Sequence, residues 1–380
     1  MQSKLERADP LKVAILGNRG IPASYGGFET FAEELSSRLV RHGHTVTVYG
    51  RKQFVDRNLR LYKGVDIRVT PCLKHKYLET VTHTAFSVVL SLFKGYDVLL
   101  VCNAANSFLC GIPRLAGQKV VLNVDGIERL RKKWGRIGKA LHHLGERMAT
   151  WVPDCVVTDS RITEDYYFQE YEFRSEYIPY GAPVERSSSQ EAVDRLHLKP
   201  REYLLFVSRL EPENNAHLVM EAHTQSGVEF PLVVVGDAPY NQKYIRELQR
   251  LSEGRNILLT GAIYGNGYRE LLSHSLCYVY GGEVGGTHPG LLEAMGAGCV
   301  LLVNDIPENR EAVGEAGILY PFNDVTALSR LMSQICGSPE AYRHYSLKAQ
   351  GWVLEQYNWD KVTEDYERLF YRLVGPPGKF

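Results

Sequence analysis

Residues 277–304, CYVYGGEVGGTHPGLLEAMGAGCVLLVN, form the stretch that decides the fold. Two apolar runs, Cys277–Tyr280 and Val300–Val303, flank a glycine-rich loop and a helix that Pro289 opens at its first turn. A strand, a loop, a helix and a second strand in this order are typical of a parallel sheet covered by helices. In such sheets ligands bind at the carboxyl ends of the strands, where the loops lead into helices.

The same alternation recurs on both sides of this stretch, and the length of 380 residues favours two domains. Residues 178–190, IPYGAPVERSSSQ, interrupt it with two prolines, a glycine and a serine run, which predicts a linker. We therefore expect an α/β protein with two doubly wound, Rossmann-like domains, over residues 1–180 and 184–357, facing each other across a cleft. The other expected strands are Lys12–Leu16, Thr45–Tyr49, Asp66–Val69, Val98–Val101, Val120–Val124, Cys155–Thr158, Tyr203–Val207, Leu232–Val235, Asn256–Leu259 and Ile318–Leu319.

Composition and charge narrow the class of protein. Lys and Arg number 44, as do Asp and Glu, so bulk charge does not favour a nucleic-acid binder. The seven cysteines are scattered without a Cys-x-x-Cys pair, which favours reduced thiols over a zinc site. The N-terminus resembles no signal peptide, and the apolar stretch Ala85–Phe93 is too short to span a bilayer. We expect a soluble, cytoplasmic protein.

Two further features suit a phosphate-bearing ligand. Gly26 and Gly27 precede an amphipathic helix, and the unpaired N–H groups of a helix start attract anions. Arg209 directly follows a predicted strand, where a guanidinium group can bind phosphoryl oxygens. Either feature alone fits a tight turn or a surface ion pair equally well. The glycine spacing does not match a dinucleotide fingerprint, which disfavours an NAD-dependent oxidoreductase.

Several motifs in order resemble a known family. SRLEPENN, VGDAPY, LTGAIYG and VGGTHPGLLEAMGAG resemble the C-terminal half of the family 4 retaining glycosyltransferases with the two-domain B-type fold. RGIPASYGGFETFAEEL and NVDGIERLRKKW resemble a narrower branch that includes bacterial rhamnosyltransferases. The resemblance implies transfer of L-rhamnose from dTDP-rhamnose to a lipid-linked or saccharide acceptor in cell-surface polysaccharide assembly. It also implies an N-terminal acceptor domain, a C-terminal nucleotide-sugar domain and a terminal helix, within 358–380, that packs back on the first domain.

The resemblance assigns roles to individual residues. Arg209 would contact the diphosphate, Glu293 the ribose, and Gly26 and Gly27 would close over the donor. No metal or other cofactor is expected, because helix amides and Arg209 would supply the counter-charge. The remaining expected donor-binding residues are Asn214, Gly261, Ala262, Ile263, Gly285, Gly286, Thr287 and His288.

Two positions depart from the family pattern. Asn214 stands where many members have a lysine, and Gly285 stands where many have the first glutamate of a Glu-x7-Glu motif, so only Glu293 remains. Together these changes suggest a retuned donor pocket, consistent with a deoxy-sugar donor.

Asp125 and the residues after it are the acceptor-side candidates. Asp125, the third expected catalytic residue beside Arg209 and Glu293, either binds acceptor or donor sugar or forms an Asp-Gly turn. Glu128 is a weaker acceptor-side candidate. The basic run that follows is expected either to bind a lipid diphosphate or an anionic membrane surface, or to be a solvated face. It comprises Arg129, Arg131, Lys132, Lys133, Arg136 and Lys139, with Trp134 among them.

Other functions stay open at this stage. The nearest alternative is the same chemistry with a UDP-hexose or UDP-N-acetylhexosamine donor. Different classes are a nucleotide-sugar epimerase, which can share the fold, and a non-catalytic partner that binds sugar nucleotides. For the transferase, the expected location is the inner face of the cell membrane, as a peripheral protein without nucleic-acid partners.

Overall fold

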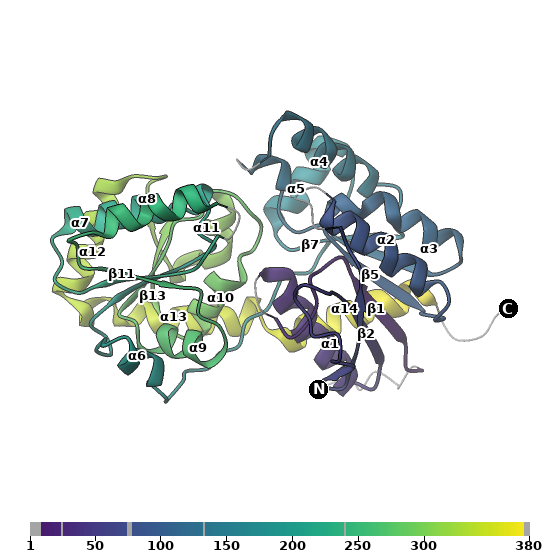
Figure 1. Cartoon of the computed structure of the whole chain (residues 1–380), viewed down its shortest axis with the longest axis horizontal. Coiled ribbons are helices and arrows are strands. Elements are labelled where there is room, and N and C mark those ends of the chain that lie inside the picture. The colour runs from purple at the N-terminus through teal and green to yellow at the C-terminus, as the bar shows by residue number, and fades with distance from the viewer. Residues whose placement is uncertain (1–8, 24–25, 74–77, 132–133, 239–240, 376–380) are drawn as a thin grey trace. The chain divides into compact units, whose positions relative to one another are not determined.

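The computed structural model describes residues 9–23, 26–73, 78–131, 134–238 and 241–375. The chain forms two compact units (Figure 1). The first comprises Met1–Arg129, Trp134–Tyr180 and Trp359–Phe380. The second comprises Gly181–Asn358 together with Leu130–Lys133.

The first unit contains an eight-stranded sheet in the order β3-β4-β2-β1-β5-β6-β7-β8. Among the described residues of this unit, the short β3 pairs with β4 in the antiparallel direction, and the other strand pairs are parallel. The central β5 is buried along its whole length, as expected for a strand covered on both faces. The strands are β1 (Lys12–Leu16), β2 (Thr45–Arg51), β3 (Leu61–Tyr62), β4 (Val65–Thr70), β5 (Val98–Cys102), β6 (Lys119–Asn123), β7 (Cys155–Thr158) and β8 (Glu176–Tyr177).

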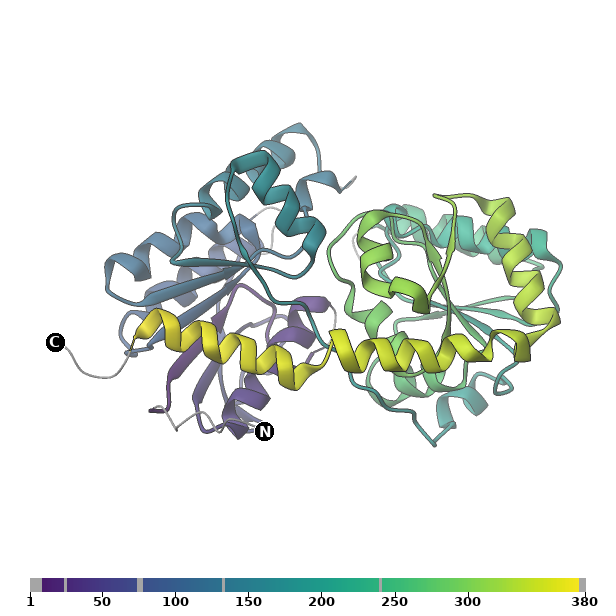
Figure 2. The same cartoon turned by 180° about the vertical axis from the view of Figure 1, so that it is seen from behind.

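Helices cover both faces of this sheet. The helix α1 packs against α14, whereas α2 and α4 both pack against the 3₁₀ helix η1, and α3 packs against η1 and α2. Figures 1 and 2 both show α2, α3 and α4 side by side. The helices are α1 (Gly27–Arg41), α2 (Glu79–Ser91), η1 (Ala104–Cys110), α3 (Gly111–Leu115), η2 (Glu128–Leu130), α4 (Arg136–Ala149), α5 (Arg161–Tyr171) and α14 (Trp359–Val374).

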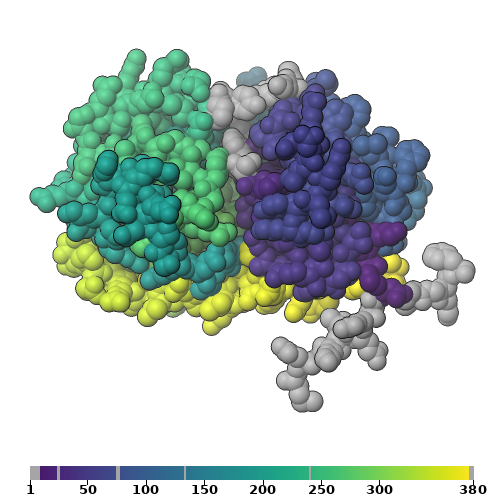
Figure 3. Space-filling view, turned by 60° about the horizontal axis from the view of Figure 1, so that its bottom comes forward, coloured from purple at the N-terminus to yellow at the C-terminus, as the bar shows by residue number. Residues whose placement is uncertain are grey.

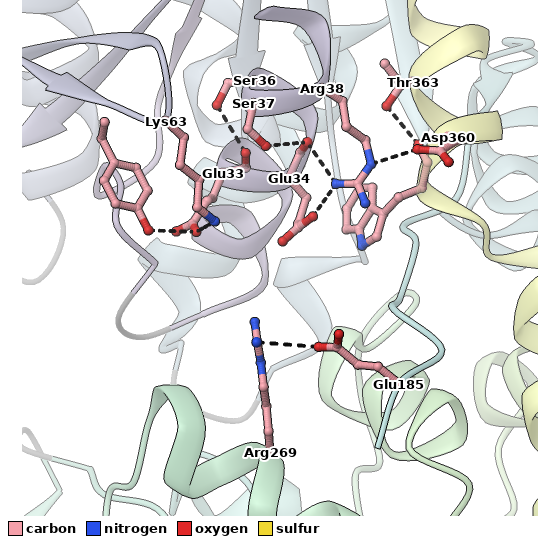
Figure 4. Close-up of polar contacts among 12 residues, drawn as sticks. Glu33, Glu34, Ser36, Ser37, Arg38, Lys63, Glu185, Arg269, Asp360 and Thr363 are labelled. Carbon is pink, nitrogen blue, oxygen red and sulfur yellow. Dashed lines mark hydrogen bonds and ion pairs between the residues drawn. The ribbon is translucent and has the colours of Figure 1, made fainter. Parts of the chain in front are cut away.

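The C-terminal helix α14 is an integral part of the first unit. Its Tyr366 is fully buried and its ring centroid lies 5.5 Å from that of Phe31 in α1. Arg38 of α1 forms ion pairs with Glu34 and with Asp360 of α14 (Figure 4). The apolar stripe of α14 therefore completes the core of a unit whose other residues lie far away in the sequence.

The second unit contains a six-stranded, fully parallel sheet in the order β11-β10-β9-β12-β13-β14. Its strands are β9 (Leu204–Val207), β10 (Leu232–Val235), β11 (Ile257–Gly261), β12 (Cys277–Tyr280), β13 (Val300–Asn304) and β14 (Ile318–Tyr320). Its helices are α6 (Glu191–Arg195), η3 (Pro212–Asn214), α7 (Ala216–Ser226), α8 (Gln242–Ser252), α9 (Gly265–His274), α10 (Pro289–Gly296), α11 (Pro307–Val313), η4 (Gly314–Ala316), α12 (Val325–Gly337) and α13 (Pro339–Gln356). The outer side of α13 belongs to the yellow surface in Figure 3.

The predicted α/β class with two Rossmann-like parallel sheets is confirmed. Each predicted strand has a counterpart, whereas the two-residue strands β3 and β8 were missed because they are too short to show alternation. Among the described residues, no helix combines the length and the apolar character needed to cross a bilayer.

Candidate functional site

The loop after β9 holds Arg209 in a fixed backbone conformation. The Arg209 carbonyl oxygen accepts hydrogen bonds from the Ser208 hydroxyl at 2.8 Å, the Glu211 N–H at 2.7 Å and the Asn214 side-chain amide at 2.7 Å. Asn214 is buried and this contact uses its amide nitrogen. The residue that replaces the customary lysine thus orders the arginine loop, and direct contact of Asn214 with a donor stays a prediction.

The glycine-rich loop after β12 is held by asparagines that sequence reasoning missed. Asn215 donates to the Gly281 carbonyl at 2.9 Å and to the Asn323 side-chain oxygen at 2.9 Å. Asn323 in turn donates to the Glu283 carboxylate at 2.9 Å. These contacts join three loops at the carboxyl edge of the sheet.

Asn304 and Asn309 extend the same network from the other side. Asn309 donates to the Gly282 carbonyl at 3.1 Å and to the Asn304 carbonyl at 2.8 Å. The Asn304 amide donates to the Asn323 side-chain oxygen at 2.9 Å. The only sequence signal was the placement of Asn304 at a strand end, which a turn explains equally well, and Asn309, within α11, showed none.

Gly285 and His288 determine the shape of the start of α10. Gly285 has a φ of +153°, and a Cβ atom there would lie 2.3 Å from the His288 Nε2 atom. A glutamate at this position would collide with the imidazole ring. The absence of the family's first glutamate is therefore coupled to the position of His288.

Positive charge converges on the start of α10. Burial, together with the charges of Arg131 and Arg209, lowers the pKa of His288 to about 3. The imidazole is consequently neutral at neutral pH, while both guanidinium groups are close enough to influence it. Two cations beside the N-terminal end of an eight-residue helix form a setting suited to an anionic group. Gly286 and the buried Thr287 complete the turn into this helix.

The prediction that Arg131 contacts a membrane surface is wrong. Its side chain is only 7% exposed and lies 3.8 Å from the carboxylate of the buried Glu213, both within the second unit. A buried, paired arginine cannot reach lipid headgroups, because a membrane contact requires an exposed charge. Arg131 contributes instead to the positive field at the start of α10.

Glu293 lies in the second turn of α10 and is oriented by a residue that sequence reasoning missed. Its carboxylate accepts a hydrogen bond of 2.8 Å from the hydroxyl of Tyr268 in α9. Burial and the neighbouring carboxylate raise the pKa of Tyr268 well above 10, so the hydroxyl remains a donor. Tyr268 showed no sequence signal, because a tyrosine on an amphipathic helix is ordinary.

The predicted base-framing loop lies at the end of β11. Gly261 and Ala262 are exposed and Ile263 is half-buried. The Gly261 carbonyl accepts a hydrogen bond of 3.0 Å from the Gly236 N–H, which ties this loop to the end of β10.

The start of α1 in the first unit already faces a carboxylate. Gly26 precedes the helix and Gly27 is its first residue. Buried Glu29 accepts a hydrogen bond of 2.9 Å from the Arg19 N–H, and its other carboxylate oxygen would lie 2.9 Å from a Cβ atom on Gly26. A role of Gly26 and Gly27 over the donor stays a prediction.

Asp125 occupies a strained backbone position just after β6. Its φ is +54°, and its N–H donates to the Asn123 side-chain oxygen at 3.2 Å. The Asn123 amide also donates to the Tyr366 hydroxyl at 2.9 Å, which connects this strand end to α14. A non-glycine residue held in the left-handed region is a feature that functional sites often contain.

The residues beside Asp125 are largely engaged within the protein. The Trp134 Nε1 atom donates to the Glu128 carboxylate at 3.0 Å. Arg129 pairs with buried Glu146 at 3.1 Å and donates to the Tyr166 hydroxyl at 2.8 Å. Lys132 and Lys133 lie outside the described residues. Within the described part of the chain, no cluster of three or more His, Cys, Asp or Glu side chains is arranged to hold a metal ion.

Comparisons with known proteins agree on the class of this chain. Residues 25–186 match the model of Glycosyltransferase Family 4, and residues 189–352 match that of Glycosyl transferases group 1. An uncharacterized glycosyltransferase of Methanocaldococcus jannaschii is 23% identical over 239 residues, covering 58% of this chain and 59% of that protein. The O-antigen chain mannosyltransferase B of Escherichia coli is 23% identical over 194 residues, covering 50% of each. The chain thus spans little more than half the length of these relatives.

Among solved structures, HepE of Anabaena in complex with UDP-glucose has a TM-score of 0.79 at 16% identity, covering 96% of this chain and 100% of that one. At this identity the likeness concerns the fold alone, and it extends over both units. The two family matches adjoin one another, one on each half, and together cover most of the sequence. The chain belongs to the glycosyltransferases of the family 4 and group 1 type.

Proposed function

We propose that this protein is a retaining glycosyltransferase that transfers L-rhamnose from dTDP-rhamnose to a lipid-linked or saccharide acceptor. The observation that carries the proposal is the convergence of Arg209 and the start of α10, where Arg131 adds positive charge. A nucleotide-sugar donor needs such a setting, because its nucleoside diphosphate leaving group accumulates negative charge as the bond to the sugar breaks.

Several polar groups at the strand ends of the second unit then have a role. Arg209 and the N–H groups of Gly286 and Thr287 neutralise the diphosphate, and no divalent ion is needed. Glu293, oriented by Tyr268, accepts hydrogen bonds from the ribose hydroxyls. The Asn215–Asn323 network keeps these loops in place before the donor arrives, which lowers the cost of ordering them.

The transfer breaks the bond between the anomeric carbon and the diphosphate oxygen and forms a bond from that carbon to the acceptor oxygen. The proton of the acceptor hydroxyl passes to the departing phosphate oxygen on the same face of the sugar, which gives retention. Asp125, in the first unit, is proposed to bind the acceptor or the donor sugar.

The identity of the donor rests on two features. Gly285 leaves no carboxylate where many relatives have one, which suits a sugar without a polar 6-hydroxyl, and the N-terminal motifs resemble the rhamnosyltransferase branch. A UDP-hexose is the second candidate, because HepE of the same fold is described in complex with UDP-glucose. No family match favours the epimerase.

A panel of nucleotide sugars tests the proposal. The protein, with and without membrane extracts as acceptor, should release dTDP from dTDP-rhamnose faster when acceptor is present. Arg209→Ala should lower the donor affinity about tenfold or more, the loss expected for a charge-assisted hydrogen bond of roughly 1.5–3 kcal/mol. Interconversion of free nucleotide sugars would indicate an epimerase instead. Activity that EDTA abolishes and magnesium restores would contradict the metal-free site.

A further inference from the structure

The helices on one face of the first unit expose apolar side chains in stripes. On α2 and just beyond it, Phe86, Val89, Leu90 and Phe93 recur at helical spacing and are all exposed, with Phe93 at 80%. Soluble helices ordinarily bury such stripes against their own core. The opposite side of α2 does face the core, through Val88, so the exposed stripe is additional to the buried one.

Two neighbouring elements repeat this feature. Phe108, Ile112 and Leu115 are exposed along η1 and α3, with Leu115 at 92%. In a separate helix, α4, the exposed apolar residues follow the same spacing of four and then three positions. They are Ile137, Leu141 and Leu144, and Trp151 follows this helix at 66% exposure.

The three stripes belong to one layer of the unit. Both α2 and α4 pack against η1, and α3 packs against η1 and α2. Figures 1 and 2 show these elements side by side. The helices α2 and α3 contact strands of the sheet, and α4 packs on η1, which lies in the same layer. Exposed apolar side chains that gather on neighbouring helices in this way mark an interaction site.

The exposed charged side chains of this layer all carry positive charge. Between 79 and 151, leaving aside 132 and 133, every charged side chain in the exposed class is basic: Lys94, Arg114, Arg136, Lys139 and Arg147. The acidic residues of that range are half-buried or buried, such as Glu128 and Glu146, which bind Trp134 and Arg129. Apolar stripes bordered by basic side chains are complementary to an anionic lipid surface.

We propose that the outer surface of α2, α3 and α4 docks this protein on an anionic membrane. Phe, Leu and Ile side chains enter the boundary between headgroups and acyl chains, Trp151 lies at headgroup depth, and the basic side chains contact lipid phosphates. The inference deepens the membrane-linked part of the proposed function, and it does not depend on which donor is used. It also removes the buried Arg131 from the predicted basic run, keeps Arg136 and Lys139 of that run, and adds the apolar stripes of α2, α3 and α4.

Sedimentation with vesicles tests the proposal on the whole chain. Vesicles of phosphatidylglycerol and phosphatidylcholine should bind the protein, and vesicles of phosphatidylcholine alone should bind it more weakly. The variant Ile137→Ser/Leu141→Ser/Leu144→Ser should lose about tenfold or more in vesicle affinity, because it removes three inserted side chains. The variant Arg136→Gln/Lys139→Gln/Arg147→Gln should reduce binding to the anionic vesicles and weaken its dependence on salt.

A matched control comes from the second unit. Leu347→Ser/Leu354→Ser removes two exposed leucines from α13, and this variant should bind vesicles like the unaltered protein. Donor binding by calorimetry should be unchanged in all three variants, which separates failure of this proposal from failure of the proposed function. Equal binding by the α4 serine variant would overturn the proposal. A protein that self-associates without lipid through the same side chains, and ignores vesicles, would overturn it in favour of a dimer interface.

Discussion

The two units share a doubly wound architecture and differ in where they place the unusual side chains. In the first unit, α2, α3 and α4 expose apolar stripes on their outer side. In Gly181–Asn358, the described large hydrophobic side chains that are exposed are four and scattered: Tyr264, Phe322, Leu347 and Leu354. Both units bury polar groups at the carboxyl ends of their strands, such as Asn123 in the first unit and Asn304 in the second, so the exposed apolar stripes are what distinguishes the first unit.

This difference shows that the fold leaves two places free for function. Core packing fixes the inner sides of the helices and the centres of the strands, but it does not fix the outer helix surface or the loops at the strand ends. As proposed above, the second unit uses its strand ends, where Arg209 and α10 are suited to an anionic group. The first unit is proposed to use its outer helix surface in addition to the strand end that holds Asp125. Four predictions, from the largest expected effect to the smallest, test how far the units are separate.

The largest effect concerns Tyr366, which α14 contributes to the core of the first unit. Tyr366→Ala should destabilise that unit by about 3–5 kcal/mol, because it removes a fully buried aromatic ring beside Phe31. Tyr366→Phe, which loses only the hydrogen bond from Asn123, should cost about 1 kcal/mol. Urea unfolding followed by hydrogen exchange of each unit measures both, and the second unit should keep its protection. An equal loss in both units would mean that they unfold as one.

The second effect concerns acid and His83, which is buried in α2 beneath the proposed membrane surface. Burial lowers the pKa of His83 to about 3, and the charge of Arg51 contributes. The unfolded chain therefore takes up a proton near pH 6.5 that the folded unit does not, so stability falls as the pH drops from 6.5 towards 3. At pH 5 the loss relative to neutral pH should be about 2 kcal/mol.

The variant His83→Gln isolates this contribution, because glutamine does not titrate. Its stability at neutral pH is expected to be lower, but its decline between pH 7 and pH 5 should be smaller by about 2 kcal/mol. Chemical denaturation at both pH values gives the comparison. An undiminished decline in the variant would assign the acid sensitivity to other groups.

The third effect concerns the donor site of the second unit. Tyr268→Phe should weaken donor binding about tenfold, because the hydroxyl that orients the Glu293 carboxylate is lost. Tyr203→Phe is the matched control, since its buried hydroxyl donates to the Leu271 carbonyl at 2.6 Å. Calorimetry with the nucleoside diphosphate measures both variants. If Tyr203→Phe weakens binding as much, the effect reflects general loosening of the unit.

The sequence predicted the strands and the positions of Arg209 and Glu293 because these depend on local pattern. Apolar runs and glycine-rich turns are visible without knowledge of contacts. Tyr268 and Asn323 could not be predicted in this way, because each acts through a partner brought near only by the sheet. Arg131 shows the same limit in reverse: its neighbours in sequence are basic, but its partner, Glu213, lies 82 positions away.

The exposed stripes were missed for a related reason. The sequence shows Ala85–Phe93 as an apolar stretch too short to span a bilayer, and such a run fits a buried segment as well as an exposed stripe. Hydrophobic periodicity indicates that a helix has an apolar side. It does not indicate whether a second apolar side of the same helix is exposed to solvent. Only the packing of α2 on the sheet and on η1 separates the two sides.

The smallest effect concerns the junction between α14 and the loop before β2. Glu367 accepts hydrogen bonds from His44 at 2.7 Å and from His42 at 2.8 Å. Burial opposes the charged form of Glu367, but these bonds and the histidine charges outweigh burial and lower its pKa below 4.5. Its stabilising contribution is therefore present above pH 4.5 and is lost as the pH falls through the lowered pKa.

The contact with His44 does not require a protonated ring. The His44 Nδ1 atom accepts a hydrogen bond of 3.0 Å from the Leu11 N–H, so the Nε2 atom carries the proton that Glu367 receives. Glu367→Gln keeps one acceptor oxygen and should cost the first unit only about 1 kcal/mol near pH 6. Glu364→Gln, an exposed change on the same helix, should cost less. If both variants unfold at the same urea concentration, the contact of Glu367 with the two histidines adds nothing to the docking of α14.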